Sequence, residues 1–371
     1  MISRSARRAV VCMLLAIVLC VAAGCAHLPH RSDGQPTNVV LMIGDGMGVA
    51  HVTAAKVAAG NLNMERLPLA GFVTTNPEYA FVTDSAASGT ALATGHKTTN
   101  GVISLSSSGD TLSTVLEQAE ARGMATGLVV TCSVTHATPA VFAAHVDDRS
   151  KDCEIAAQIA QSGVDVLFGG GRSYFLPTSQ SGLRDDGEDL LKTLRWRMPI
   201  ALSAGEFRKL GDVERAVALL SSEHPPPVQL RDPPLPELTE KALEILARDP
   251  DGFFLMVEGS QIDWAGHENA SDWIVAETLD FDRAVGVVLD FAEKDGHTLV
   301  VVTADHETGG YALLDGSVER REVSRTRFGS DGHTATMVPL LAYGPGSESF
   351  GGILDNTDVG RALIGFVGAA P

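Results

Sequence analysis

Six short runs of apolar residues recur along the chain and alternate with amphipathic stretches of helical length. Within each run the apolar residues are continuous, which is the pattern of strands covered on both faces of a sheet. This order predicts an α/β fold, with a doubly wound, mainly parallel central sheet and helices on both faces, in a single domain. The expected strands are residues 38–43, 126–131, 164–168, 253–257, 298–303 and 338–343, and the clearest helical stretches are residues 112–122, 238–248 and 275–294.

Composition and charge narrow the class of protein. With 371 residues, 44% of them hydrophobic, the chain can bury a large core, and five cysteines are too few for a disulfide-stapled miniprotein. The formal net charge of −18 argues against nucleic acid as a partner, because phosphate backbones are bound by clusters of Lys and Arg. The same charge argues weakly against any anionic small-molecule substrate.

The N-terminus has the features of an export signal. Three arginines precede the apolar run 9–23, which is shorter than the about 20 residues that a membrane span needs. The run leads to Cys25 in a sequence that resembles the lipobox of bacterial lipoproteins, so we expect residues 1–24 to be removed and Cys25 to be lipidated. The alternative is cleavage near Ala23, which would release a soluble protein.

Export has consequences for the rest of the chain. We expect residues 25–37 to be a polar linker and residues 38–371 to be the main domain, located in the periplasm or cell envelope. In that oxidising location Cys132 and Cys153 either pair or remain two buried free thiols. The Pro-rich residues 225–236 are expected to form a loop or an insertion.

Acidic and imidazole side chains stand close to the ends of the predicted strands. In open parallel sheets, ligands bind beyond the carboxyl ends of the strands, so side chains at these positions converge. Each has an ordinary explanation on its own, since an Asp between glycines is usual in turns. Together they indicate a metal site. The residues are Asp45, His136, Thr138, Glu258, Asp263, His267, Asp305, His306 and His333.

The chemistry of these side chains indicates zinc and magnesium. Asp and His are ligands of catalytic zinc, and with no cysteine nearby a closed structural zinc site is not expected. Asp263 and His267 are four residues apart, so on a helical turn both side chains face the same way. Asp45, Glu258 and Thr138 offer only oxygens, which suits magnesium. Asp45 is the simplest candidate for a carboxylate that bridges two metals.

A second constellation is the stretch of small residues 83–95. It has the pattern of a helix start capped by Thr83 or Asp84, which places Ser85 in the first turn. There the helix dipole and free backbone N–H groups favour an alkoxide and an anionic substrate. The alternative is that Ser85 or Ser88 only caps a tightly packed, Ala-rich helix. A nearby metal cluster favours the catalytic interpretation, since zinc can activate a serine hydroxyl that has no partner base.

Six stretches together resemble the alkaline phosphatase family, in the family's order and from about residue 38 to residue 346. Six motifs in order are far more specific than any one of them. The stretches are NVVLMIGDGMG (38–48), TDSAASGTALATG (83–95), HATPAVFAAHVDDR (136–149), EGSQIDWAGH (258–267), TADHETGG (303–310) and HTATMVPLLAYGPG (333–346).

The resemblance implies a role for each of these residues. Ser85 is implied as the nucleophile that becomes phosphorylated, and Arg149 as the guanidinium that clamps two phosphate oxygens, a task that suits its planar fork. Two zinc ions and one magnesium ion are implied as cofactors. The implied ligands are Asp263, His267 and His333 for one zinc, Asp45, Asp305 and His306 for the other, and Asp45, Thr138 and Glu258 for magnesium.

At two positions the chain departs from the best-known bacterial form of the family, which has Asp in place of His136 and Lys in place of Trp264. It resembles instead a branch of compact bacterial members that carry this pair. An imidazole near the third site would either bind the metal, favouring zinc or cobalt over magnesium, or hydrogen-bond a metal-bound water. The remaining histidines are expected at the surface or in packing positions; they are His51, His96, His145, His224 and His297.

The resemblance thus implies a metal-dependent hydrolase that releases inorganic phosphate from small phosphate monoesters through a phosphoserine, and a homodimer. The rival interpretations are a phosphodiesterase or other hydrolase of the same superfamily, and a non-catalytic envelope lipoprotein that binds metal or phosphate. A sulfatase is not indicated, because the motif Cys/Ser-x-Pro-x-Arg is not found around Ser85. Three divalent cations would make the site locally positive, so the acidic net charge does not exclude an anionic substrate.

Overall fold

The computed structural model describes residues 35–368. The expected export signal, Cys25 and most of the expected linker lie outside the described residues. Residues 36–368 all belong to one compact unit. Within the described part of the chain, no helix is both long enough and apolar enough to cross a membrane.

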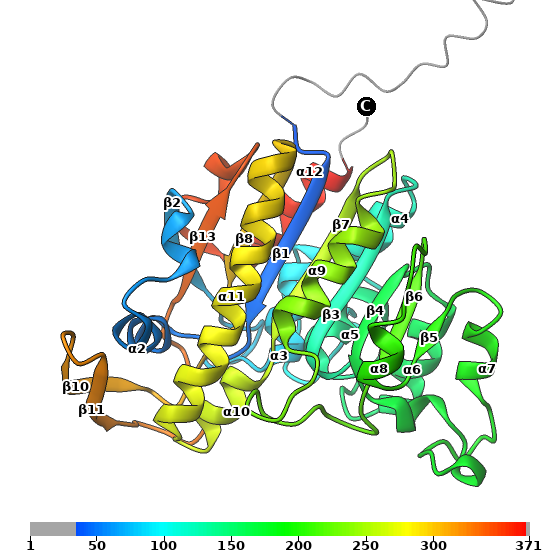
Figure 1. The fold of residues 1–371 in the computed structure, drawn as a ribbon, viewed down its shortest axis with the longest axis horizontal. Helices are drawn as coiled ribbons and strands as arrows, with labels where there is room; N and C mark the ends of the chain where they lie inside the picture. Colours follow the sequence, from blue (N-terminus) through cyan, green and yellow to red (C-terminus); the bar gives the residue numbers. More distant parts are fainter. Residues whose placement is uncertain (1–34, 369–371) are drawn as a thin grey trace, which may run out of the picture. The chain divides into compact units, whose positions relative to one another are not determined.

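A ten-stranded sheet forms the centre of residues 35–368 (Figure 1). Its strand order is β14-β2-β13-β8-β1-β7-β3-β4-β6-β5, and every neighbouring pair is parallel except that β13 runs antiparallel to both β2 and β8. The strands are β1 (Asn38–Gly44), β2 (Leu69–Thr74), β3 (Ala125–Ser133), β4 (Val166–Gly170), β5 (Ile200–Ala201), β6 (Ala216–Leu219), β7 (Phe253–Gly259), β8 (Thr298–Thr303), β13 (Val338–Tyr343) and β14 (Gly352–Asp355). The predicted doubly wound, mainly parallel α/β fold is confirmed.

Helices cover both faces of this sheet. On one face α9 (Leu235–Leu246) and α11 (Ser271–Asp295) cross the central strands, and α2 (Val49–Ala59) packs against α11 (Figure 1). The helices of the other face pack on one another and on β1, β3 and β7. They are α3 (Ser85–Thr94), α4 (Val115–Glu120), α5 (Ala137–Ala143) and α12 (Asn356–Gly368).

The central strands are buried along their whole length. Every residue of β1, β3, β7 and β8 is buried. Continuous apolar sequence is therefore required there, because a polar side chain on either face would meet a helix and not water. The predicted bounds of β8 and of the half-buried β13 are exact, and those of β1, β3 and β7 differ by one or two residues at an end. β4 begins two residues later than expected, and α4 is shorter than the expected stretch 112–122.

The register of the central strands brings their carboxyl ends level. Gly44 of β1 pairs with Gly259 of β7, and Ile43 pairs with Thr303 of β8. The residues that follow these strands therefore meet at one edge of the sheet, next to the N-terminus of α3 and next to α10 (Gln261–His267), as seen at the lower end of β1 in Figure 1.

Three local expectations are refined by the structure. His333, expected in a loop, lies in the two-residue strand β12 (His333–Thr334), which pairs with β9 (Glu307–Thr308). The Pro-rich loop ends at Pro234, since α9 begins at Leu235. Cys132 and Cys153 are both free, and only Cys132 is buried.

Candidate active site

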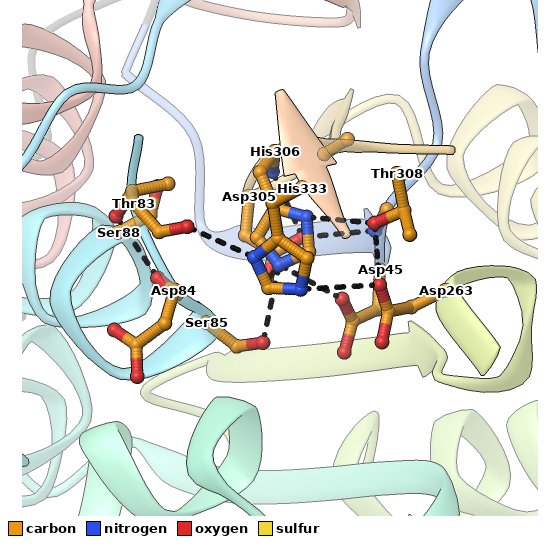
Figure 2. Close-up of polar contacts among 12 residues, drawn as sticks. Asp45, Thr83, Asp84, Ser85, Ser88, Asp263, Asp305, His306, Thr308 and His333 are labelled. Atoms are coloured by element: carbon orange, nitrogen blue, oxygen red, sulfur yellow. Dashed lines mark hydrogen bonds and ion pairs between the residues drawn. The ribbon is translucent and has the colours of Figure 1, made fainter. Parts of the chain in front are cut away.

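Ser85 is the first residue of α3 and is buried. Asp84 caps the helix by accepting a hydrogen bond from the Ala87 amide at 2.9 Å, so Asp84 and not Thr83 is the N-cap. The Ser85 hydroxyl lies 3.2 Å from Nε2 of His306 (Figure 2). The cap thus fixes the hydroxyl at the positive end of the helix dipole and aims it at the end of β8.

A buried group of two carboxylates and one imidazole lies beside Ser85. Nε2 of His306 is 3.4 Å from Oδ1 of Asp45 and 3.3 Å from Oδ2 of Asp305, and all three side chains are fully buried. Oδ1 of Asp305 accepts hydrogen bonds from the backbone amides of Gly46 and His306. Both oxygens of Asp45 and Oδ2 of Asp305 have no hydrogen-bond partner among residues 35–368.

A second group joins α10 to β12. Asp263 and His267 face the same way on α10, with Nε2 of His267 3.3 Å from Oδ2 of Asp263. Nε2 of His333 lies 3.2 Å from Nε2 of His267 and 3.5 Å from Oδ1 of Asp263. The rings of His333 and His306 stack at 3.5 Å, so the two groups are contiguous.

Hydrogen bonds fix which nitrogen of His306 faces the carboxylates. The Thr308 hydroxyl donates to Oδ1 of Asp263 at 2.5 Å and lies 3.1 Å from Nδ1 of His306 (Figure 2). Because a hydroxyl has one proton, Nδ1 of His306 must be the donor to Thr308. The lone pair of Nε2 then points at Asp45 and Asp305.

The other two imidazoles are oriented by backbone carbonyls. Nδ1 of His333 donates to the Thr83 carbonyl at 2.9 Å, and Nδ1 of His267 donates to the Asp331 carbonyl at 2.6 Å. In each ring the Nε2 atom therefore faces Asp263. Three imidazoles held with Nε2 toward carboxylates form the arrangement in which proteins bind metals, because outer hydrogen bonds set the tautomer of ligand histidines.

The pKa shifts of these side chains also indicate a site for cations. Burial, reinforced by the Asp305 charge, raises the pKa of Asp45 well above its usual range, and burial with the Asp263 charge raises the pKa of Asp305 to about 6. Burial lowers the pKa of His306, so this ring is neutral. Buried carboxylates with unpartnered oxygens are costly unless a cation neutralises them. The donor sets of both groups therefore suit divalent metals.

A third group lies between β3, β7 and α5. Glu258 of β7 is fully buried, and burial raises the pKa of its carboxyl to about 7. Oε1 of Glu258, the Thr138 hydroxyl and Nδ1 of His136 have no hydrogen-bond partner in the described part of the chain. All three residues are among those expected at a third metal site.

The third group also contains a sulfur atom. Cys132, His136 and Glu258 each offer a ligand atom, and these atoms all lie within 4.8 Å of one another. The two groups expected to bind zinc contain no cysteine, as predicted, but the third group contains Cys132. The signal was present in the sequence, since Cys132 directly follows the predicted strand 126–131.

Arg149 faces the N-terminus of α3. Its Nη1 donates to Oδ2 of Asp84 at 3.0 Å and its Nη2 donates to Nε2 of His136 at 3.2 Å. Burial and the Arg149 charge lower the pKa of His136 to about 3, which keeps this ring neutral and able to accept. The Asp84–Arg149 ion pair links two segments 65 residues apart, and sequence reasoning did not find it.

Trp264 stands among imidazole rings beside the third group. Its ring lies 6.2 Å from His136 and 4.8 Å from His224, both edge to face. His224 accepts a hydrogen bond from the Ser133 amide at 3.0 Å through Nδ1. His224, which was expected at the surface or in a packing position, therefore lies next to the candidate third site.

Comparisons with known proteins agree with this geometry. The sequence profile of the family described as alkaline phosphatase matches residues 36–321. Alkaline phosphatase 3 of Bacillus subtilis is 32% identical over 88% of each chain, and alkaline phosphatase of Escherichia coli K12 is 32% identical over 88% of this chain and 85% of its own. Streptomycin-6-phosphate phosphatase of Streptomyces griseus is 34% identical over 98% of this chain and 97% of its own.

Solved structures give the same result. Alkaline phosphatase of the Antarctic bacterium TAB5 is 36% identical, covers 90% of this chain and 98% of its own, and superposes with a TM-score of 0.83. Two variants of that protein, in which a histidine is replaced by Asp or by Glu, contain magnesium in the site called M3. Alkaline phosphatase of Thermus thermophilus is 26% identical over 90% of this chain and 92% of its own, with a TM-score of 0.83.

Proposed function

This chain belongs to the alkaline phosphatase family, a family of metal-dependent enzymes that hydrolyse phosphate monoesters, and from that premise we propose that Ser85 is the nucleophile of this enzyme. One observation carries the proposal. The Ser85 hydroxyl lies 3.2 Å from Nε2 of His306, inside a cluster of buried carboxylate oxygens that have no other partner among the described residues. A structural serine at a helix start would not require that cluster.

The three groups of side chains are the proposed metal ligands. When bound, the cations would neutralise the carboxylates, favour the ionised Ser85 hydroxyl and stabilise charge on the leaving oxygen. The proposed sets are Asp263, His267 and His333 for one zinc ion, Asp45, Asp305 and His306 for a second, and Asp45, Thr138 and Glu258, with His136 and Trp264 close by, for a third ion that is magnesium, zinc or cobalt.

The residues of the chain then act in two displacements. The Ser85 oxygen forms a bond to phosphorus as the ester oxygen leaves, and water then attacks phosphorus, releasing inorganic phosphate and restoring the Ser85 hydroxyl. Arg149 binds two phosphate oxygens through its planar fork, and Asp84 keeps that fork beside Ser85. The N-terminal amides of α3 favour the added negative charge.

The Arg149 fork supports a monoesterase over a diesterase. It offers two donors to free phosphate oxygens; a monoester has a third such oxygen for the proposed cations, whereas a diester has only two in all. The comparison of kcat/KM for a mono- and a diester of the same phenol tests this choice. A higher value for the diester would favour the phosphodiesterase alternative.

The main test is hydrolysis of an aryl phosphate by the purified protein before chelation, after chelation, and after zinc and magnesium are added back. We expect activity to be lost with the metal and restored on add-back, with the metal content measured in each state. Activity that is unchanged after chelation would contradict the metal assignment. Persistent inactivity of the zinc-loaded protein would support the alternative of a non-catalytic lipoprotein.

The location and assembly of the protein are part of the proposal. Residues 1–24 are proposed to be an export signal of the lipoprotein type and residues 25–37 a linker, with the catalytic domain in residues 38–371. Cell fractionation of wild-type protein and of a Cys25→Ala variant tests the anchor, which should hold only the wild-type protein in the membrane fraction. Sedimentation of the purified protein tests the homodimer.

A further inference from the structure

Cys132 lies inside the third group and not beside it. Its strand β3 pairs with β7 so that Val130 is level with Glu258, which brings the thiol to the same sheet edge as the carboxylate. Sγ of Cys132 is 3.5 Å from Oε2 of Glu258, and the sulfur is fully buried. The thiol also donates to the Ser133 carbonyl at 3.1 Å.

The spacing of these atoms suits a shared metal. In a tetrahedral zinc site with a sulfur bond of about 2.3 Å and an oxygen bond of about 2.0 Å, the two donors are about 3.5 Å apart. The distance between Sγ of Cys132 and Oε2 of Glu258 has this value. Sγ of Cys132, one ring nitrogen of His136 and one carboxylate oxygen of Glu258 all lie within 4.8 Å of one another. Small side-chain adjustments would therefore bring all three onto one ion.

Independent evidence that a ligand belongs here comes from the neighbouring polar atoms. Oε1 of Glu258, the Thr138 hydroxyl and Nδ1 of His136 are buried and have no hydrogen-bond partner within residues 35–368. Buried polar atoms are nearly always satisfied in proteins, so unsatisfied atoms on several side chains of one group indicate a bound ligand.

We propose that Cys132 is a sulfur ligand of the third metal, together with His136 and Glu258, and that this site takes zinc in preference to magnesium. The inference rests on the proposed function only in that the third group is one of its metal sites. A thiolate and an imidazole select zinc or cobalt, whereas magnesium prefers oxygen ligands alone. On binding, the thiol proton that faces the Ser133 carbonyl is released to solvent, and sulfur forms a bond to the metal.

A metal on His136 also changes the contact made by Arg149. In this structure Arg149 donates to Nε2 of His136, so the ring proton is on Nδ1. A metal on Nε2 takes that lone pair, and a metal on Nδ1 moves the ring proton to Nε2. In both cases the Arg149–His136 hydrogen bond ends, and one arm of the guanidinium becomes available to phosphate.

The test is titration of the metal-depleted, full-length protein with Co²⁺, followed by absorption spectroscopy. We expect a thiolate-to-cobalt charge-transfer band in the near-ultraviolet for the wild-type protein. The band should be absent from the Cys132→Ser and Cys132→Ala variants. Cys153→Ser is the matched control, because this half-buried thiol donates to the Leu183 carbonyl, and it should keep the band.

A second readout uses competition between metals. After dialysis against mixed zinc and magnesium, Cys132→Ser should hold more magnesium and less zinc than wild type, with a shift in preference of at least about tenfold. Native near-ultraviolet circular dichroism of the two Cys132 variants confirms that they fold. Cys132→Ser and Cys132→Ala replace the thiol by side chains of different size, so the test still works if one of the two variants misfolds.

Two results would overturn the inference. One is a wild-type protein with full cobalt occupancy and no thiolate band, and the other is a band that survives in a folded Cys132→Ser variant. Phosphatase activity is scored separately. Full hydrolysis without the band would reject the sulfur ligand and leave the proposed function intact. The band without hydrolysis would support the sulfur ligand and contradict the proposed function.

Discussion

Two clusters of buried charge in this molecule differ in one respect. In the first, Arg231 lies 2.7 Å from Glu277 and 3.1 Å from Asp280, and all three side chains are at most 3% exposed. In the second, Asp45 and Asp305 are equally buried beside Ser85, but three of their four oxygens have no partner in the described part of the chain.

The difference indicates what each cluster does. Arg231 connects the Pro-rich loop to α11, and its carboxylate partners also accept hydrogen bonds from backbone amides and from Trp273. Such a paired cluster contributes to the fold. Unpaired buried carboxylates destabilise the metal-free fold and are retained only where a ligand completes them. Buried charge by itself therefore does not identify a site, but incomplete pairing does.

Among the variants that compare the two clusters, the largest effect is expected from Asp45→Asn. Loss of a metal ligand should lower kcat/KM by roughly a hundredfold or more. The free energy of unfolding of the metal-free variant should rise by about 0.5–2 kcal/mol, because a buried charge without a partner is removed. Activity assays and denaturant unfolding after chelation measure the two effects.

The control is Asp282→Asn, the same change at a similarly buried carboxylate. Asp282 accepts hydrogen bonds from the backbone amides of Asn63 and Met64, so its neutralisation should destabilise the protein by about 1–3 kcal/mol. If both variants were destabilised equally without metal, the distinction between the two kinds of cluster would be lost.

In the paired cluster, Arg231→Met should destabilise the fold without changing the catalysed reaction. Glu277 and Asp280 would be left buried and unpaired, at a cost of about 3–5 kcal/mol. The kcat of the folded fraction should be unchanged. Urea unfolding measures the loss, and Arg320→Met, in an exposed ion pair, should lose less than about 1 kcal/mol. A large fall in kcat for Arg231→Met would show that the two clusters are coupled.

Arg149 is intermediate between the paired and the unpaired cluster. It has hydrogen-bond partners in the protein, but we propose that it exchanges one of them for the substrate. Arg149→Ala should lower kcat/KM roughly 10- to 100-fold and weaken inhibition by phosphate, in keeping with about 1.5–3 kcal/mol for a charge-assisted hydrogen bond. Arg149→Lys keeps the charge and loses the fork, so it should restore only part of the activity. Wild-type phosphate inhibition in Arg149→Ala would argue against the clamp.

The smallest effect concerns a pair with complete partners near the surface. Burial lowers the pKa of His145, but its hydrogen bonds to Glu117 and to the Ser104 carbonyl outweigh burial, and the net pKa is raised. A raised folded-state pKa stabilises the protein fully below the unfolded value of 6.5, and that stabilisation is lost as the pH rises through the folded value.

Glu117→Gln should therefore reduce the free energy of unfolding by less than about 1 kcal/mol near pH 6, with a smaller difference near pH 9. Chemical unfolding at several pH values checks this. Glu319→Gln, at an exposed position, should show no such trend. A difference that grows with pH would contradict the assigned direction of the His145 shift.

The sequence predicts the centre of this molecule better than its edges. Strands β1, β3, β7 and β8 are continuous apolar runs because both faces are buried. Only Val73 of strand β2 is buried, and β5 has only two residues, so neither carries that pattern. Such strands are specified by their neighbours in the sheet, which a local pattern does not contain.

The same reasoning applies to the site. Ligands that directly follow strands, such as Asp45 and Asp305, are identifiable because topology alone brings strand ends together. The Asp84–Arg149 ion pair and the contact of His224 with Trp264 depend on how loops from distant segments pack, so no spacing rule reveals them. Cys132 had the right position in the sequence, but its burial beside Glu258 is a property of strand pairing.

In the proposed mechanism Ser85 carries the phosphoryl group during turnover. Rapid acid quenching during hydrolysis of an aryl phosphate, followed by peptide mass spectrometry, measures it directly. We predict a phosphoryl group on the peptide that contains Ser85 in the zinc-loaded wild-type protein, and none after chelation or in Ser85→Ala, which should fold normally but lose activity by at least about a thousandfold. Phosphorylation of another residue, or a Ser85→Ala variant with wild-type turnover, would show that Ser85 is not the nucleophile.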